Sequence, residues 1–474
     1  MKHRTWVILA IGGLLTAWAC MAAFLPAGPR KTPAVVSAGG GSSRVQLSVG
    51  DVVTLTAALG SSHVLAGGPG DLALDVALEA GEAGGSTERV PVDVALVIDR
   101  SGSMAGEKIQ AARAAAHRLV GLLRPGDRVA LVSYASDVTV QVGLIDPGAG
   151  GSATAMVHGA IDGMMAEGST FLDGGLSRAA ELLGPAAQRG RAQRIVLISD
   201  GEANVGRTTS ADLDPIARTA AERGVTLSTI GVGLAFNERL MMGLADAGAG
   251  NYYYLREGSE LALTFTRELE HLSRTVARAA VIEITPAAGT RVVDVSGHMF
   301  ERTATGVTIR VGDLPARSSR KVLVRLAMDP AAIGPMPAAA VTLRFEDARA
   351  RRVVEGRADL GVTVTDRVAE VERGRDREVM AALAEVEASE GMATAMSAFE
   401  SGDTGGARQG LAGRAAALAA QAAALGGVEG ERIQRAAESL SGAGAALADS
   451  PAAASPAGLD LIKRSRAQAR ELAH

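Results

Sequence analysis

The chain has 474 residues, which corresponds to about three domains of ordinary size. Hydrophobic residues make up 47% of the sequence but aromatic residues only 3%, so we expect aliphatic cores. The formal charge of −4 provides no basic surface for nucleic acid, which excludes that class of partner. Cys20 is the only cysteine in the sequence, so an intramolecular disulfide bond is excluded as well.

The N-terminus has the features of an export signal or a membrane anchor. Lys2-His3-Arg4 precede an uncharged apolar run from Trp6 to Leu25, whose length suits a signal peptide or a single membrane span. The positive flank predicts that the rest of the chain is exported. We therefore expect residues 1–25 to be a signal peptide or an anchor, and the protein to be exported and membrane-anchored, in the periplasm or at the cell surface.

Cys20 allows two interpretations. It follows Ala17-Trp18-Ala19, which is similar to the cleavage site of bacterial lipoproteins. The alternative is that Cys20 is only a small hydrophobic residue within the anchor or signal.

The next two segments differ in their pattern. Residues 26–43 contain Pro, Gly, Ser and Lys without a period, which predicts a flexible linker. Residues 44–89 alternate apolar and polar residues between Gly-rich turns, which predicts short half-buried strands. These strands are too few to close a core by themselves.

Strand and helix patterns alternate over residues 90–278. The short β-branched run Val94–Ile98 predicts a strand buried on both faces of a parallel sheet. The whole region therefore predicts a doubly wound α/β fold with a parallel sheet, in which Val138–Leu144 suits an edge strand. We expect helices over residues 107–123, 154–165, 172–183, 212–223, 237–247 and 259–277, and further strands over residues 127–134, 195–199, 226–232 and 252–255.

The remaining sequence predicts two more regions. Residues 279–366 return to alternation, which predicts a β-sandwich completed by the strands of residues 44–89. The α/β domain would then be an insertion between the two halves of this sandwich. Residues 367–474 are rich in Ala, Glu and Arg and predict an α-helical region. This region is either an Ala-rich packing or dimerising tail, or an array faintly similar to tetratricopeptide pairs.

Oxygen-bearing side chains follow the first strand of the α/β region. Asp99-Arg100-Ser101-Gly102-Ser103 places one carboxylate and two hydroxyls on the loop that leaves this strand. Ligands bind at such strand ends in open α/β sheets, and Mg²⁺ prefers oxygen ligands. Because hydroxyls add no charge, an ion held by them would still attract one more carboxylate from outside.

The pattern Asp99-x-Ser101-x-Ser103 resembles the metal-ion-dependent adhesion site of von Willebrand factor type A (VWA) domains. Two further loops match this family in order, namely Gly168-Ser169-Thr170 and the loop Ile198–Asn204, which contains Asp200. The resemblance is to bacterial exported or membrane-anchored members of the family. It implies a site for Mg²⁺, with Ca²⁺ or Mn²⁺ as alternatives, formed by Asp99, Ser101, Ser103, Thr170 and Asp200.

The resemblance also implies a role for each of these residues. Ser101 and Ser103 would contact the ion directly, Thr170 would join or leave with the conformational state, and the aspartates would act directly or through water. The helix expected at 259–277 is similar to the one that slides in this family when the metal site changes affinity. The alternative is that both aspartates cap helices and that the serines are turn residues.

These observations predict a Mg²⁺-dependent, adhesion-type protein-binding module at the cell envelope, in which an Asp or Glu of a protein partner completes the coordination. We expect no catalysis, because Ser103 lacks a G-x-S-x-G elbow and no histidine lies on a strand-end loop of the α/β region. The alternative is a structural or assembly component of an envelope complex, in which the metal only stabilises the VWA domain. The sequence leaves the identity of the partner and the oligomeric state open.

Overall fold

The computed structural model of the chain describes residues 35–82, 90–149, 151–184, 191–448 and 452–473. The signal peptide or anchor expected at residues 1–25, including Cys20, lies outside these residues. Among the helices of the described part of the chain, none is both long and apolar enough to cross a membrane.

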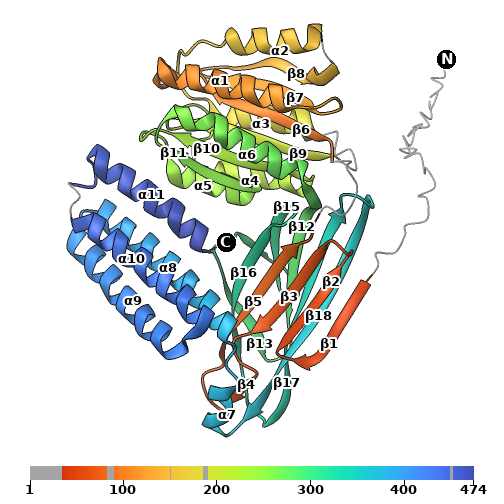
Figure 1. Cartoon of the computed structure of the whole chain (residues 1–474), viewed down its shortest axis with the longest axis vertical. Coiled ribbons are helices and arrows are strands. Elements are labelled where there is room, and N and C mark those ends of the chain that lie inside the picture. Colours follow the sequence, from red (N-terminus) through yellow and green to blue (C-terminus); the bar gives the residue numbers. More distant parts are fainter. Residues whose placement is uncertain (1–34, 83–89, 150, 185–190, 449–451, 474) are drawn as a thin grey trace, which may run out of the picture. The chain divides into compact units, whose positions relative to one another are not determined.

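The α/β unit is built on a six-stranded sheet with helices on both faces (Figure 1). Its strands follow the spatial order β11-β10-β9-β6-β7-β8. All neighbours are parallel except β8, which is antiparallel to β7. The sheet is therefore mixed, and the expectation of a parallel sheet is wrong at this edge, because the short turn after β7 reverses the chain. The strands are β6 (Val92–Asp99), β7 (Arg128–Tyr134), β8 (Val138–Ile145), β9 (Ala192–Ser199), β10 (Val225–Val232) and β11 (Ala249–Leu255).

Strand β6 lies in the middle of this sheet and contributes to two cores. Leu96 and Ile98 pack into the core that contains α1, α2 and α6, whereas Ala95 and Val97 pack into the core that contains α3, α4 and α5. Every residue of β6 is buried, which explains why its sequence is an apolar run instead of an alternation. The helices are α1 (Glu107–Leu122), α2 (Ser152–Asp162), α3 (Leu172–Leu183), α4 (Ser210–Glu222), α5 (Glu238–Ala247) and α6 (Leu261–Ser273).

The last helix of this unit is shorter than expected. A helix was expected over residues 259–277, but α6 ends at Ser273 and strand β12 begins at Thr275. Val276 and Ala277 are buried in the core of the neighbouring sheets. Their apolar side chains fit a helical stripe as well as a strand, so only this packing identifies them as strand residues.

Two further sheets share one apolar core, the arrangement of a sandwich. One has the order β13-β16-β5-β3-β2, and the other has the order β1-β18-β17-β12-β15-β14 with β4 beside β18. Strands from before and after the α/β unit pair directly, since β5 is antiparallel to β16 with Val76 opposite Val322. The chain leaves these sheets after β5 and returns to them with β12. The strands are β1 (Val35–Ser42), β2 (Arg44–Val49), β3 (Val53–Leu59), β4 (His63–Leu65), β5 (Asp71–Ala80), β12 (Thr275–Pro286), β13 (Thr290–Ser296), β14 (Phe300–Arg302), β15 (Val307–Pro315), β16 (Ser319–Met328), β17 (Gly334–Asp347) and β18 (Arg352–Thr365).

Strand β1 corrects the expectation of a flexible linker at residues 26–43. Residues 35–42 form this strand, which is parallel to β18 with Val35 opposite Glu355. The backbone of β18 provides an edge that this segment joins, and that partner lies far away in the sequence. Local composition therefore could not reveal the pairing. Residues 26–34 lie outside the described part of the chain.

In the described part of the chain, five helices follow the sandwich, and four of them enclose a core rich in alanine and leucine. Aspartates begin two of these helices: Asp376 accepts hydrogen bonds from the backbone N–H groups of Glu378 and Val379, and Asp403 accepts one from Gly406. Such caps satisfy donors that a helix leaves unpaired at its N-terminus. The helices are α7 (Val368–Arg373), α8 (Arg377–Glu400), α9 (Thr404–Leu425), α10 (Gly427–Ala448) and α11 (Pro456–Ala473).

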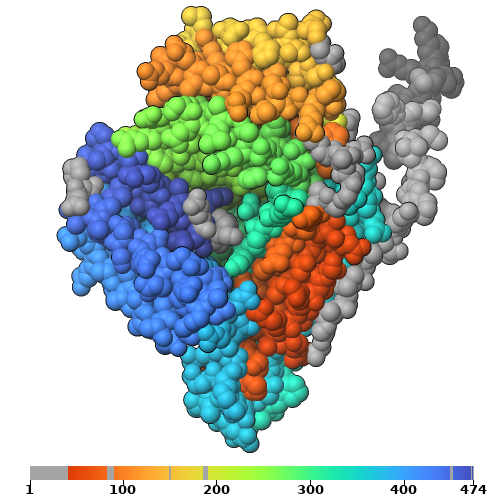
Figure 2. Space-filling view, in the orientation of Figure 1, coloured from red at the N-terminus to blue at the C-terminus, as the bar shows by residue number. Residues whose placement is uncertain are grey.

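Helix α11 contacts the α/β unit through polar side chains. In the space-filling view the dark blue C-terminal helix lies against the green part of the α/β unit (Figure 2). The Lys463 ammonium donates to the carbonyl of Phe236 at 3.0 Å, and Tyr254 donates to Asp460 at 2.7 Å. Arg466 pairs with Glu238 of α5 at 3.1 Å. Charged side chains that are buried in this way are paired, as burial of a charge requires.

Candidate metal centre

The candidate site lies where β6 and β9 end. These neighbouring strands are parallel, and the connections that follow them run to opposite sides, so this edge is the point where the strand order reverses. Asp99 is the last residue of β6, and Asp200 directly follows β9. Thr170 lies on the loop just before α3. The fold thus brings the three loops identified in the sequence to one edge of the sheet.

A chain of oxygen atoms connects the first loop to the third. The hydroxyls of Ser101 and Ser103 lie 3.1 Å apart. The Ser103 hydroxyl donates a hydrogen bond of 2.8 Å to Oδ1 of Asp200. Ser101 and Asp200 are buried whereas Ser103 is exposed, so this oxygen chain reaches the solvent at Ser103.

The hydroxyl of Thr170, on the second loop, and the hydroxyl of Ser103 both lie close to Gly201 of the third loop. A Cβ atom on Gly201 would lie 3.4 Å from the Ser103 hydroxyl and 3.6 Å from the Thr170 hydroxyl. Both hydroxyls therefore face the position that a side chain at residue 201 would begin to fill. The five side chains named from the sequence are gathered in this one place.

Backbone hydrogen bonds fasten the loops to one another. The N–H of Gly102 donates to the carbonyl of Gly168 at 3.0 Å. Asn204 accepts from the N–H of Thr170 at 2.9 Å through its side chain, and its own N–H donates to the Thr170 carbonyl at 3.1 Å. The position of Thr170 therefore depends on the loop that contains Asp200.

Asp99 organises the first loop from a fully buried position. Its Oδ1 accepts from the N–H of Ser101 at 2.8 Å, and its Oδ2 accepts from the Ser199 hydroxyl at 2.7 Å. Burial raises the pKa of Asp99, the hydrogen bonds from Ser101 and Ser199 oppose this rise, and the negative charge of Asp200 adds to it. Both carboxylate oxygens are engaged, which favours an indirect role toward a bound ion.

Asp200 is also fully buried and has a cationic partner. The ammonium of Lys108, on the first turn of α1, forms an ion pair with Oδ2 of Asp200. The same ammonium donates to the carbonyl of Ser103 at 3.3 Å. Lys108 thus connects α1 to the first and the third loop.

The alternative that these aspartates cap helices is wrong. The N-cap residues of α1, α3 and α4 are Gly106, Phe171 and Thr209. Asp99 instead closes a local turn by accepting the N–H two residues ahead. Asp200 contacts the side chains of Ser103 on the first loop and of Lys108 on α1.

Comparison with known proteins agrees with this fold and with the position of the loops. The sequence profile of the von Willebrand factor type A domain matches residues 93–267. The chain contains a VWA domain. The match begins within β6 and ends within α6, so it spans the α/β unit and all three loops of the site.

Relatives by sequence share this domain and differ in length. The uncharacterized protein YfbK of Escherichia coli is 36% identical over 206 residues, which are 42% of this chain and 35% of YfbK. The inter-alpha-trypsin inhibitor heavy chain H4 of Bos taurus is 31% identical over 190 residues, which are 38% of this chain and 20% of that protein. The chain thus spans about a third of YfbK and a fifth of the heavy chain.

Solved structures extend the likeness of the fold beyond the VWA domain. A von Willebrand factor type A protein from Catenulispora acidiphila has a TM-score of 0.64 at 19% identity and covers 78% of this chain and 88% of its own. The ArnB paralog VWA2 from Sulfolobus acidocaldarius has a TM-score of 0.61 at 18% identity, with 89% and 99% covered. Because the family match ends at residue 267, such coverage also includes parts of the chain outside the VWA domain.

The oxygen atoms of the site fit the needs of Mg²⁺. Neighbouring ligands of an octahedral Mg²⁺ ion lie about 3.0 Å apart, since its bonds to oxygen are about 2.1 Å long. The separations Ser101–Ser103 and Ser103–Asp200, of 3.1 and 2.8 Å, fall close to this value. Among the described residues, no group of three or more His, Cys, Asp or Glu side chains forms a metal cluster. The site of the VWA domain is instead rich in hydroxyls.

Sequence reasoning missed three residues that shape the site. Ser199 is the last residue of β9, and Asn204 lies on the loop that follows. A polar residue at the end of a buried strand was a signal that could have singled out Ser199. Lys108 carried no such signal, because a lysine on the first turn of an amphipathic helix is ordinary.

Proposed function

We propose that the VWA domain binds Mg²⁺ through Asp99, Ser101, Ser103, Thr170 and Asp200, and that the bound ion holds an Asp or Glu side chain of a protein partner. Ca²⁺ or Mn²⁺ could replace Mg²⁺ in such a donor set. The observation that carries the proposal is the gathering of the five side chains on three loops at one edge of the sheet. VWA domains are typically protein-interaction modules, which agrees with this function.

The proposed ligands would leave a bound ion with most of its positive charge, so that it attracts a further carboxylate. Three of the five side chains are uncharged hydroxyls, and both oxygens of Asp99 are already engaged by Ser101 and Ser199. Little of the charge of a dication would then be neutralised by direct ligands. Ser103 is exposed, so an incoming carboxylate can reach the ion from the solvent side.

The proposal includes no catalytic step. Among the described residues, the side-chain hydrogen bonds of Ser103 join it to Ser101 and Asp200, and no histidine contacts either serine. A nucleophilic serine requires a base within hydrogen-bond reach. We also propose that the domain works at the cell envelope, on the basis of the apolar run in residues 1–25.

Titration calorimetry of the full chain tests metal binding. After dialysis against EDTA and then buffer, wild-type protein should bind one Mg²⁺ per chain. The double variant Ser101→Ala, Ser103→Ala should lose this binding. Thr219→Ala, which removes an exposed hydroxyl from α4, should bind like wild type. Wild-type protein that binds no Mg²⁺, Ca²⁺ or Mn²⁺ would refute the proposal.

Capture of partners from membrane extracts tests the second half of the proposal. Wild-type protein should retain a partner in Mg²⁺ and release it in EDTA, and the double serine variant should not retain it. Binding of an isolated partner that persists unchanged in excess EDTA would exclude the metal-bridged mechanism.

A structural or assembly role is the second candidate, and the contacts of α11 favour it. Arg466, Tyr254 and Asp460 connect the helical region to the VWA domain, so the whole chain could act as a scaffold in which the ion only stabilises one part. Under this alternative, Mg²⁺ should raise the melting temperature without changing the capture of partners.

A further inference from the structure

Lys108 places a positive charge inside the candidate site. Its ammonium pairs with Oδ2 of Asp200, whose other oxygen accepts from Ser103. The side chain crosses Gly233, the residue after β10, where a Cβ atom would lie 3.6 Å from Cε and 3.7 Å from Nζ of Lys108. The lysine thus passes close to the backbone of residue 233 on its way to the end of β9.

The charges around Asp200 can be summed from these contacts. The carboxylates of Asp99 and Asp200 and the ammonium of Lys108 add up to −1. A bound dication would bring the site to +1, and a carboxylate from a partner would then make it neutral. Without Lys108, the dication alone would neutralise the site and leave no net charge to attract an acid.

We infer that Lys108 sets the balance between the metal and the partner: it weakens the binding of the dication and strengthens the binding of a carboxylate to the loaded site. This inference rests on the proposed function. The physical reason is that a like charge close to the ion repels it, and this repulsion is stronger beside the fully buried Asp200 carboxylate than it would be in bulk water. Lys108 acts through Asp200 and is a positioning residue. Its side chain is 34% exposed, so it can adjust when an ion enters.

The inference predicts effects of opposite sign in one variant. Lys108→Met retains the apolar stem over Gly233 and removes the charge. In calorimetry of the full chain with MgCl₂, we expect this variant to bind Mg²⁺ about tenfold more tightly than wild type. Replacing chloride by acetate at equal ionic strength should raise the apparent Mg²⁺ affinity of wild type. The factor of this increase should be at least threefold smaller in the variant.

Three further variants separate this role from a general effect. Lys108→Arg keeps the charge and should behave like wild type. Arg118→Gln removes one charge from the same helix, where Arg118 contacts Thr266, and should leave both affinities unchanged. Lys108→Gln provides a second neutral variant if the methionine variant folds poorly. Both neutral variants should also melt at a lower temperature without metal, because Asp200 loses its counter-ion.

The outcomes of these titrations are distinct. If wild type binds no divalent cation, the proposed function itself fails. If wild type binds Mg²⁺ and the neutral variants bind it equally or more weakly, the inference on Lys108 fails and the proposed function stands. Weaker Mg²⁺ binding together with a lower melting temperature would mean that Lys108 only supports the loops.

Discussion

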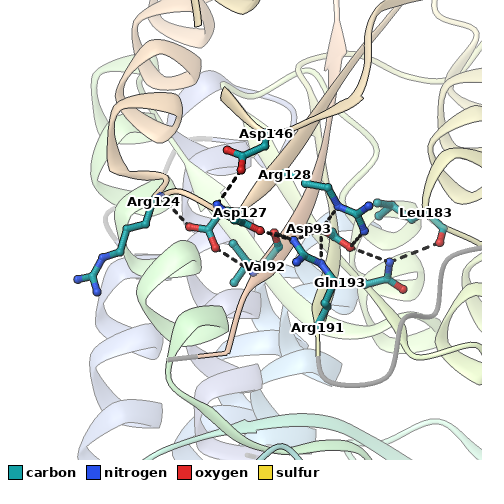
Figure 3. A network of polar contacts seen from close by, with 10 residues as sticks. Val92, Asp93, Arg124, Asp127, Arg128, Asp146, Leu183, Arg191 and Gln193 are labelled. Atoms are coloured by element: carbon teal, nitrogen blue, oxygen red, sulfur yellow. Dashed lines mark hydrogen bonds and ion pairs between the residues drawn. The ribbon is translucent and has the colours of Figure 1, made fainter. Parts of the chain in front are cut away.

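Strand β6 has a buried aspartate near each of its ends, and the two carboxylates have different partners. Asp93, at the start of the strand, contacts two arginines and an amide (Figure 3). Arg128 donates two hydrogen bonds to it at 2.8 and 2.7 Å, Arg191 approaches to 2.6 Å, and Gln193 donates at 3.1 Å. The carboxylate is thus surrounded by strong, charged donors.

The other end of the strand has hydroxyls in place of guanidinium groups. Asp99 accepts from Ser199 and from a backbone N–H, and Asp200 accepts from Ser103 and pairs with Lys108, its one cationic partner among the described residues. Two buried carboxylates therefore share one positive charge.

The pKa directions follow this difference in partners. Burial by itself would raise the pKa of Asp93, but the hydrogen bonds and charges of Arg128 and Arg191 outweigh it and lower the pKa. Burial raises the pKa of Asp99, the charge of Asp200 adds to this rise, and the hydrogen bonds from Ser101 and Ser199 only partly oppose it. The carboxylate of Asp93, at the start of β6, is neutralised by two arginines. The carboxylates at the other end of the strand can still accept a cation from outside.

The largest effect should come from removing the carboxylate of Asp93. Asp93→Ala leaves two guanidinium groups without their carboxylate, and we expect the free energy of unfolding to fall by about 3 kcal/mol. Urea denaturation monitored by circular dichroism measures this. The Mg²⁺ affinity of the folded variant should stay within threefold of wild type.

An exposed carboxylate is the control for this variant. Glu181 pairs with Arg178 on the surface of α3, and Glu181→Ala should cost less than about 0.5 kcal/mol. Equal losses of free energy of unfolding in the two variants would mean that the ion pairs of Asp93 stabilise the fold no more than an exposed ion pair does.

Removing the carboxylate at the other end should mainly affect the metal. In Asp99→Ala the first loop loses the acceptor for Ser101 and Ser199, and we expect Mg²⁺ affinity to fall between about tenfold and hundredfold. Calorimetry measures the affinity, and a thermal melt without metal should show a smaller loss than Asp93→Ala. A loss of stability as large as that of Asp93→Ala, with unchanged Mg²⁺ affinity of the folded variant, would contradict the division of roles.

Lowering the pH should weaken the ion pairs of Asp93, with a smaller effect than the substitutions of Asp93 and Asp99 above. The folded-state pKa of Asp93 lies below its ordinary value of 3.8. The stability that it contributes is therefore present above about pH 4 and is lost as the pH falls through the folded-state pKa. Melting temperatures of wild type and Asp93→Asn should converge below about pH 4. A constant difference from pH 7 down to pH 2.5 would be inconsistent with this pKa direction.

The smallest effect should come from the link between the second and third loops. Asn204→Ala removes the acceptor of the Thr170 N–H, which should cost about 1 kcal/mol of stability. Mg²⁺ affinity should fall a few-fold, since Thr170 loses its fixed position. Gln434→Ala removes an exposed amide that contacts Glu438 and serves as the control. Identical melting curves and affinities for the two variants would exclude this role of Asn204.

Local sequence was sufficient to find the two strand ends of the site. The apolar run of β6 stops at Asp99 and that of β9 stops just before Asp200, so the strand ends are visible in the sequence. Parallel pairing of the two strands then places these ends at one edge. The resemblance to VWA domains supplied Thr170, which lies outside any strand.

Partners from other elements could not be predicted in the same way. Lys108 lies on the first turn of a helix, and Arg191 lies just before β9, where neither residue type is unusual. Their importance comes from the buried carboxylates that they contact, Asp200 and Asp93. Burial and contact are properties of the folded chain, so no local pattern signals them.

The sequence by itself determined the alternation of strands and helices and the oxygen side chains that end β6 and β9, because hydrophobic periodicity and turn residues act over a few neighbouring positions. Only the tertiary structure decided that β1 joins β18, that α11 contacts the VWA domain, and which cation neutralises each buried carboxylate. These outcomes depend on pairing between residues far apart in the chain, and the strength of each pair depends on the burial that only the complete fold creates.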